Sequence, residues 1–383
     1  MIKSNYVSKL MFSSVDSKAS FDIAKKIGAQ GIIDEITASR LRGCGGAGFP
    51  TGMKLTLMAK EKAEPKYVIC NADEGEPGTF KDREILTNYA ELVFTGMAIA
   101  GKAIGAAKGI LYLRAEYSFM KEHLTAMIAK CQEFTNFAID IKSGAGAYVC
   151  GEETALIESL EGKRGEPRNR PPFPIQSGYL GKPSEVNNVE TFAWITAVMS
   201  NGAKWFSSIG TEKSSGYKIF SVSGDCNRPG IYEFPMGTTI AEMLNAVGGE
   251  GAKAVQMGGA SGQTIPKNQF DRKIAFEDAP PGGSIIVFGP KRNMLDVAEN
   301  FLEFFVEESC GQCTPCRKGN VQLLEAIRAI KAGKYGVPDC SAKLYSLAET
   351  MQIVSKCSLG QSSPNVFMAV TKYFSDEIKS GGK

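Results

Sequence analysis

Three cysteines near the C-terminus have the spacing of ligands to an inorganic cluster. Cys310, Cys313 and Cys316 form a C-x-x-C-x-x-C pattern, and Gly311 within it permits tight curvature. An iron–sulfur cube needs thiolates that converge on separate irons, which a short curled loop can supply. A structural zinc ion is the alternative, but zinc sites usually combine two C-x-x-C units. The spacing therefore favours an iron–sulfur cluster over zinc.

The fourth ligand of such a cluster must come from another part of the chain. Cys340 and Cys357 both lie downstream of the triplet, and spacing alone does not choose between them. Apolar residues recur at helical intervals on both sides of the triplet, over 295–305 and 321–330. Cys357 falls in a later loop between two expected helices, which is a sensible position for a ligand.

Two glycine-rich loops could bind phosphate groups. Residues 41–54 contain G-x-G-x-x-G, and residues 143–156 run from glycines into a helix. Backbone N–H groups in such loops approach anions closely, and a helix N-terminus favours negative charge. The first loop follows a helical segment rather than a strand, so it fits the usual dinucleotide fingerprint poorly. Its alternative is a tight structural loop, but two such loops in one domain indicate a nucleotide.

Further polar and aromatic groups could complete a nucleotide site. The acidic segment 71–78 follows a strand expected at 66–70, where ligand sites of α/β proteins gather. Its carboxylates could bind ribityl or ribose hydroxyls, although a solvated turn or a divalent-metal loop would have the same composition. Phe173, in a proline-rich loop, could stack on a flat ring. A basic run over 163–170 could attract a pyrophosphate or form a solvated face.

The single histidine limits the chemistry of the chain. His123 lies in a charged helical segment and is expected at the surface. Hydrolytic triads and most catalytic zinc centres need an imidazole at the site, so these classes are disfavoured. Glycine, carboxylate and cysteine are abundant instead, which suits an organic redox cofactor that passes electrons to a metal cluster.

Composition bounds the partners and the compartment. The chain has 383 residues, ten cysteines and a net charge of +3. This charge is too small to indicate a nucleic-acid partner, and no apolar stretch is long enough for membrane insertion. We expect a soluble, cytoplasmic protein with mostly reduced cysteines, or one peripheral to a membrane complex through its partners.

The pattern of elements predicts a multidomain fold with α/β, α+β and all-α parts. Residues 1–215 are expected to form the α/β domain, 216–292 a small β-grasp domain and 293–383 a helical bundle that carries the cluster. Thr238 is expected to cap the helix of the middle domain. The expected strands are 66–70, 109–114, 217–223, 230–234 and 284–288, and the expected helices include 87–107, 117–134, 239–247, 342–355 and 364–379.

Six motifs together resemble one known family. They are G-x-G-G-A-G-F-P-T-G-x-K, N-A-D-E-x-E-P-G-T, G-A-G-A-Y-x-C-G-E-E-T-A-L, P-P-F-P, V-N-N-V-E-T and E-S-C-G-x-C-x-P-C-R-x-G. In this order they resemble the flavoprotein subunit of NADH dehydrogenases, which occurs in respiratory complex I and in NAD-dependent hydrogenases and formate dehydrogenases. The resemblance spans nearly the whole chain. It implies a Rossmann-like domain for FMN and NADH, a β-grasp domain of the soluble-ligand-binding type and a helical domain with a [4Fe–4S] cluster.

The resemblance also implies roles for individual residues. Those implied for FMN are Gly43, Gly45, Gly46, Ala47, Gly48, Lys54, Asn71, Asp73, Glu74, Tyr148, Gly151, Glu152, Asn187 and Asn188. Those implied for NADH are Phe49, Glu76, Glu153, Arg170 and Phe173. The implied cluster ligands are Cys310, Cys313, Cys316 and Cys357, so the resemblance selects Cys357 over Cys340. No protein side chain is expected to act as a catalytic acid or base; Glu76 and Glu153 position the nucleotide.

The function implied is electron input from NADH through FMN to the cluster and on to partner subunits. The expected partners are a thioredoxin-like [2Fe–2S] subunit and a larger iron–sulfur subunit. The same chemistry run in reverse, or in a bifurcating complex with ferredoxin, hydrogen or formate, is an alternative, and a non-catalytic cluster or zinc scaffold is a remote one. Cys44 stands where the family usually has arginine, and we expect it to be a small filler rather than a redox thiol.

Overall fold

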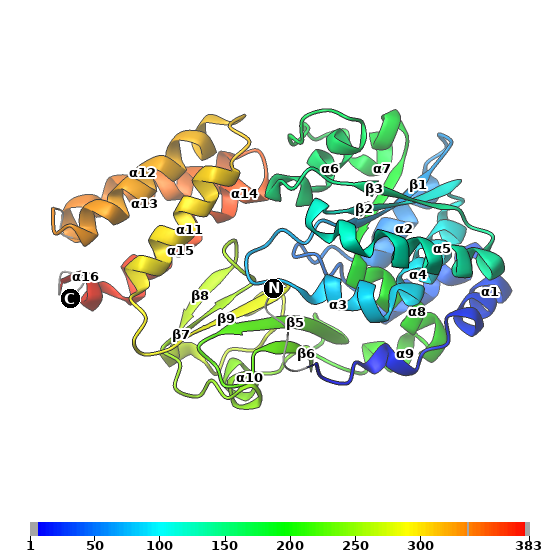
Figure 1. Ribbon diagram of the computed structural model, residues 1–383, viewed down its shortest axis with the longest axis horizontal. Helices are drawn as coiled ribbons and strands as arrows, with labels where there is room; N and C mark the ends of the chain where they lie inside the picture. The colour runs from blue at the N-terminus through cyan, green and yellow to red at the C-terminus, as the bar shows by residue number, and fades with distance from the viewer. Residues whose placement is uncertain (1–6, 335–336, 380–383) are drawn as a thin grey trace.

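Three regions follow one another along the chain. The structure is a computed structural model that describes residues 7–334 and 337–379, without the side chains of 337–341 and 378–379. Figure 1 shows an α/β region, a strand-rich region beneath it and a helical region at the other end of the long axis. The boundaries expected at 215/216 and 292/293 stay predictions.

A parallel sheet forms the centre of the α/β region. Its strand order is β3-β2-β1-β4. The strands are β1 (Tyr67–Ala72), β2 (Lys108–Leu113), β3 (Ile139–Ser143) and β4 (Ser184–Asn188). β1 and β2 are nearly continuous apolar runs, as expected for strands covered on both faces, and both were predicted. The shorter and more polar β3 and β4 were not predicted.

Helices cover both faces of this sheet. Within the described residues they are α1 (Ser17–Ser39), α2 (Thr51–Lys60), α3 (Lys81–Asn88), α4 (Ala90–Ile104), α5 (Lys121–Thr135), α6 (Glu153–Leu160), α7 (Pro174–Ser177), α8 (Val189–Asn201) and α9 (Ala203–Ser207). α1, α4, α5 and α8 share an apolar cluster with one sheet face, and α6 packs on the other. The single helix predicted over 87–107 is wrong at its start, because Tyr89 has a non-helical backbone between α3 and α4.

The strand-rich region is a five-stranded mixed sheet with one helix on its core face. The strand order is β6-β5-β9-β7-β8, and β5 pairs in parallel with β9 between antiparallel neighbours. The elements are β5 (Tyr217–Gly224), β6 (Gly230–Pro235), α10 (Ile240–Val247), β7 (Ala254–Met257), β8 (Gln263–Pro266) and β9 (Ser284–Phe288). The predicted strands β5, β6 and β9 are confirmed. The predicted cap is wrong: Thr239, not Thr238, caps α10 and exchanges hydrogen bonds with Glu242.

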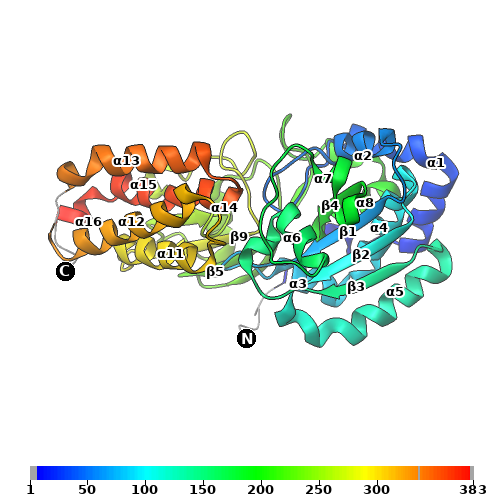
Figure 2. The same ribbon diagram turned by 90° about the horizontal axis from the view of Figure 1, so that it is seen from above.

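The C-terminal region is helical. Its elements are α11 (Met294–Glu308), α12 (Thr314–Lys331), α13 (Val337–Val354), α14 (Ser358–Ser362), α15 (Pro364–Tyr373) and α16 (Ser375–Lys379). Cys310 and Cys313 lie between α11 and α12, as predicted, but Cys316 lies in the first turn of α12, because this helix begins at Thr314. The helix predicted over 364–379 is interrupted at Phe374, whose backbone leaves the helical conformation. Figure 2 shows this bundle at one end of the molecule and the α/β region at the other.

One apolar cluster runs from the second face of the parallel sheet into the helical bundle. It contains Ile69 and Val186 of the sheet together with Leu302 and Phe305 of α11. The bundle is therefore packed onto the α/β region rather than tethered to it. Among the described residues, no helix is long and apolar enough to cross a bilayer.

Candidate functional site

A large cleft opens at the carboxyl ends of the parallel strands. Its volume is about 890 Å³, within the usual range for a cofactor or ligand site. β1 lies between β2 and β4. The connection that follows β1 leads to β2 on one side of it, and β4 joins the sheet on the other side. Such a reversal of strand order is where open α/β sheets bind ligands. All nineteen residues implied for FMN and NADH line this cleft.

Several of the predicted side chains are already used within the protein. Glu74 accepts hydrogen bonds from two backbone N–H groups at the start of α3 and from the Tyr117 hydroxyl. Glu152 and Asn188 accept from backbone N–H groups at the starts of α6 and α8. Both amide atoms of Asn71 are paired with backbone groups. These four side chains shape the cleft, and hydrogen bonds within the protein orient them.

Other groups in the cleft lack partners and therefore fit a ligand with many hydroxyls. Oδ2 of Asp73 and the hydroxyl of Thr79 are buried without a hydrogen bond. Burial raises the pKa of Asp73 to about 7. An orphaned buried acceptor costs free energy, so it marks a place for a donor that the protein itself does not supply. Ribityl or ribose hydroxyls and flavin N–H groups are such donors, and the residues present fit FMN.

The first glycine-rich loop lies between α1 and α2 and presents main chain to the cleft. Gly46 and Gly48 have φ of 120° and 63°, which favour glycine. A Cβ at Gly48 would lie 2.2 Å from the ring of Phe276, so this loop is held against the β-grasp region. The guanidinium of Arg42 also contacts this ring, at 5.1 Å from its centroid. Phe276 therefore packs against two residues of the glycine-rich segment.

Charged and aromatic side chains surround the cleft where NADH is expected. Lys54 Nζ lies 3.8 Å from Glu153, and Arg170 lies 3.8 Å from Glu153 on its other oxygen. Phe49 and Phe173 keep 43% and 47% of their surface exposed, so two aromatic faces are open to a flat ring. The arrangement can hold a nucleotide by stacking and by hydrogen bonds to its hydroxyls and phosphates.

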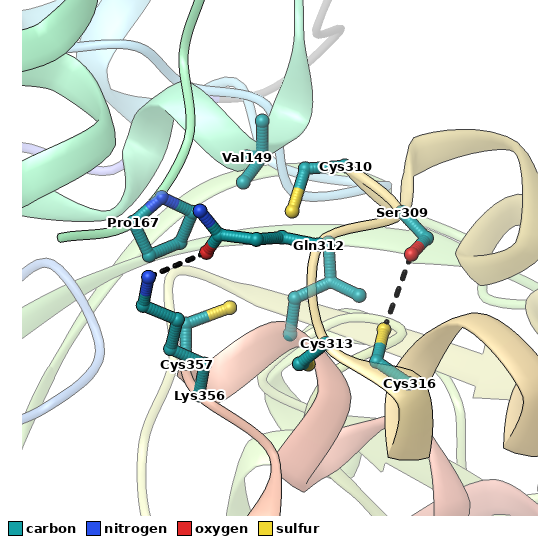
Figure 3. A pocket seen from close by; sticks show the side chains of 10 residues that line it. Val149, Pro167, Ser309, Cys310, Gln312, Cys313, Cys316, Lys356 and Cys357 are labelled. Carbon is teal, nitrogen blue, oxygen red and sulfur yellow. Dashed lines mark hydrogen bonds between the residues drawn. The ribbon is translucent and has the colours of Figure 1, made fainter. Parts of the chain in front are cut away.

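The four predicted cluster ligands line one small pocket. Figure 3 shows Cys310 and Cys313 on the loop before α12 and Cys316 in the first turn of that helix, with Cys357, the N-cap of α14, facing them. In the part of the chain described, no three His, Cys, Asp or Glu side chains converge closely enough for one ion. Four thiols around one pocket are a donor set that fits a [4Fe–4S] cluster.

Burial and two hydrogen-bonding side chains set the chemistry of the thiols in this pocket. Burial raises the pKa of Cys316 to about 11, and burial also raises the pKa of Cys357. Coordination to a cation deprotonates such thiols outright. Ser309 lies 3.3 Å from Cys316 Sγ, and Asn320 donates to the same sulfur at 3.4 Å. Hydrogen bonds to ligand sulfurs tune the potential of a cluster. The sequence reasoning missed Asn320, which has no motif signal beyond its position one turn after Cys316.

The cleft and the thiol pocket share a wall. Val149, Cys357 and Leu359 line both of them. The second glycine-rich loop supplies Val149, and the bundle supplies the other two residues. A cofactor in the cleft and a cluster in the pocket would therefore lie on opposite sides of a single layer of side chains.

A buried ion network in the wall of the cleft was not predicted from the sequence. Glu190 accepts from Lys218 Nζ at 2.6 Å and lies 3.0 Å from Lys81 Nζ, and Lys81 pairs with Asp82. These four residues are at most 3% exposed. Lys218 belongs to β5, so the network joins the β-grasp region to the α/β region. The V-N-N-V-E-T motif contains Glu190, but nothing in it reveals the two lysines.

Cys44 lines the cleft but is only 4% exposed. Burial raises the pKa of this thiol to about 12, so the reactive thiolate is suppressed at neutral pH. This agrees with its predicted role as a small filler. The side chain of Cys340, the rejected alternative ligand, lies outside the described residues.

The fold and the site together define a class: a flavin- and iron–sulfur-binding oxidoreductase subunit. Residues 36–197 match the Nuo51 FMN-binding domain, 219–264 the SLBB domain and 296–381 the NADH-ubiquinone oxidoreductase-F iron-sulfur binding region. The chain belongs to the family of F-type flavoproteins that NADH-quinone oxidoreductases and NAD-reducing hydrogenases contain.

Relatives in this family come from different complexes. The chain is 45% identical to the NAD-reducing hydrogenase HoxS subunit alpha of Cupriavidus necator, covering 98% of this chain and 65% of the relative. It is 43% identical to the HndC component of the NADP-reducing hydrogenase of Solidesulfovibrio fructosivorans, covering 91% and 75%. It is 39% identical to an F-type component of the NADH-quinone oxidoreductase of Rhizobium meliloti, covering 91% and 87%.

A solved structure has the same architecture. An NAD+-reducing [NiFe]-hydrogenase in the H2-reduced state superposes with a TM-score of 0.93 at 42% identity, covering 97% of this chain and 66% of that one. The chain thus spans about two thirds of the length of this hydrogenase chain and slightly less than two thirds of the HoxS relative.

Proposed function

We propose that this chain exchanges electrons between NAD(H) and partner subunits through FMN in the cleft and a [4Fe–4S] cluster in the thiol pocket. The observation that carries the proposal is the wall shared by the two sites. When bound, FMN supplies the conversion between two-electron chemistry with a nicotinamide and one-electron chemistry with a cluster. The single layer of residues between the sites keeps the electron-transfer path short.

The chain's own residues bind and orient. Asp73 and Thr79 offer unpaired polar atoms to the flavin, and the glycine-rich loop offers its backbone N–H groups. Phe49 and Phe173 stack on the nucleotide and exclude water from its face. Glu153, between Lys54 and Arg170, meets the ribose and opposes a 2′-phosphate by charge repulsion. No side chain is required to move a proton during hydride transfer.

Anaerobic titration of the purified holoprotein with NADH tests this function. We expect the flavin absorbance to bleach and a reduced-cluster signal to appear in electron paramagnetic resonance. Iron and acid-labile sulfide should be present at about four of each per chain, as a cubane cluster requires. Colourless protein that contains zinc and no flavin would instead support the scaffold alternative.

The physiological direction is a second question, because relatives include both hydrogenase and quinone-reductase subunits. We propose electron input from NADH as the principal role; reduction of NAD+ by a hydrogenase or a bifurcating partner is the alternative. Purification of the native complex, followed by identification of its subunits and cofactors, distinguishes the two. The specific partners proposed are a thioredoxin-like [2Fe–2S] subunit and a larger iron–sulfur subunit.

An exposed apolar pair marks the proposed exit for electrons. Ile353 and Val354, at the end of α13, are 78% and 54% exposed. The pair precedes Cys357 by only a few residues. Lys356 and Cys357 both line the thiol pocket. Large exposed aliphatic groups beside a cluster suit a protein interface. We propose that the next electron-carrying subunit docks here.

A further inference from the structure

The β-grasp region places one side chain against a carboxylate in the cofactor cleft. Ser261, between β7 and β8, donates its backbone N–H to Glu76 Oε1 at 3.1 Å and its hydroxyl to Oε2 at 2.6 Å. The Tyr148 hydroxyl donates to the same Oε2, also at 2.6 Å. Glu76, Ser261 and Tyr148 all line the cleft. The carboxylate is thus held from two different domains.

Hydrogen bonds from the β-grasp sheet and from the helical bundle fix the loop that carries Ser261. The Gln256 side chain, buried in the β-grasp sheet, donates to the carbonyl of Gly259 at 2.7 Å. Asn365 of α15 lies 3.3 Å from the carbonyl oxygen of Ser261. A Cβ at Gly259 would lie 2.4 Å from Cγ of Glu76, so the loop backbone also abuts this side chain. The loop is therefore a rigid support for Glu76.

This support fixes the orientation of the carboxylate at the cleft. Four donors of the protein reach it: the hydroxyls of Ser261 and Tyr148 and the backbone N–H groups of Ser261 and Ala260. A carboxylate has about four acceptor positions, so these donors hold it in one orientation. Burial raises the pKa of Glu76, whereas the hydrogen bonds from Ser261 and Tyr148 lower it. Removal of the serine hydroxyl would take away one of the hydrogen bonds that orient the side chain and would favour its protonated form.

We propose that Ser261 is a positioning residue of the nucleotide site: through it the β-grasp domain fixes the carboxylate of Glu76 where it meets the nucleotide, and thereby sets nucleotide affinity. This inference rests on the proposed function, in which Glu76 hydrogen-bonds NAD(H). It gives the β-grasp domain a role inside the cleft of the neighbouring domain.

A double-mutant cycle on the full-length holoprotein tests the proposal. The ligand is NAD+, which binds without reducing the flavin, and the measured quantity is its Kd. We expect S261A to weaken NAD+ binding about tenfold, the size of a lost hydrogen bond to a charged group. S261T keeps the hydroxyl and should stay within about twofold of the wild type. In an E76Q background, S261A should add less than about twofold, because residues that act through each other are not additive.

Matched variants keep the test decisive. T238A removes a hydroxyl of the same domain that bonds only to the nearby carbonyl of Pro235, and it should leave the Kd unchanged. If S261A fails to load cofactors, the nearly isosteric S261C, a weak donor, replaces it and should weaken NAD+ similarly. An unchanged Kd in S261A and S261C overturns the proposal. So does a loss of NAD+ affinity from S261A that is equally large in the wild-type and E76Q backgrounds. Wild-type protein that neither binds NAD+ nor is bleached by NADH overturns the proposed function instead.

Discussion

At the scale of single residues, Cys357 belongs to both parts of the site. It is the N-cap residue of α14, it lies in the same pocket as the cysteine triplet, and it also lines the cleft. We predict that C357A loses the [4Fe–4S] cluster, because three thiolates leave one iron without a protein ligand. FMN should be retained. Iron and sulfide content together with electron paramagnetic resonance check this, with C340A as the matched control. Cluster loss in C340A and not in C357A would show that the ligand set is wrong.

Glu153 is the residue expected to select the nucleotide. Its carboxylate lies between Lys54 and Arg170 at the cleft. We predict that E153Q raises the ratio of kcat/KM for NADPH to that for NADH by about tenfold, since one repulsion of a 2′-phosphate worth roughly 1.4 kcal/mol is removed. Steady-state rates with each nucleotide measure this. E122Q removes an exposed charge on α5 and should leave the ratio unchanged. Complete loss of hydride transfer in E153Q with normal FMN and nucleotide occupancy would contradict a purely binding role.

At the scale of elements, Glu233 on β6 links the N-terminal segment to the β-grasp sheet. Its Oε2 accepts from the backbone N–H of Met11 at 2.9 Å, and its Oε1 is buried without a partner. Burial raises the pKa of Glu233 to about 8. The folded state therefore holds a proton that the unfolded state releases above its own pKa of about 4.5. The contribution of Glu233 to the free energy of unfolding is largest below pH 4.5, and it is lost as the pH rises through 8.

We predict that the free energy of unfolding of the wild type falls by on the order of 3 kcal/mol between pH 5 and 8 because of this group. E233Q cannot ionise, so its stability should vary less over the same window. Denaturation midpoints at the two pH values measure the difference. E250Q removes an exposed carboxylate of the same domain and should behave as the wild type. A pH dependence in E233Q as steep as that of the wild type would rule out Glu233 as its source.

At the scale of the whole molecule, the thiol pocket proposed for the cluster lies at the junction between the α/β region and the bundle (Figure 2), close to the exposed pair at the end of α13. We predict that I353E weakens association with the electron-accepting subunit by more than about tenfold, because a charge enters an apolar contact. Flavin bleaching by NADH should be unaffected. Co-purification of the native complex and the rate of reduction of its partner clusters provide the measurement.

A control for that prediction is F119E, which places the same charge on a 63% exposed side chain of the α/β region. It should not affect assembly. Normal assembly and normal partner reduction in I353E would show that the exit lies on another surface of the bundle.

Much of the site was predictable because its chemistry is local in the chain. The C-x-x-C-x-x-C triplet and the two glycine-rich loops each curl within one short segment, so their spacing alone carries the geometry. Long apolar runs predicted β1 and β2, whereas β3 and β4 are short strands with several polar residues. The helix break at Tyr89 was missed because the periodicity continues on both sides of it.

The sequence by itself determined the residue types and the family, and it predicted the cysteine triplet as cluster ligands. Only the tertiary structure decided which polar atoms remain free. Glu74 and Glu152 accept hydrogen bonds from backbone N–H groups at helix N-termini, while Oδ2 of Asp73 is buried without a partner. The tertiary structure also brought Ser261 to Glu76 and Cys357 to the wall between the two sites. Hydrogen-bond partners far apart in the chain meet only through domain packing, which no local pattern encodes.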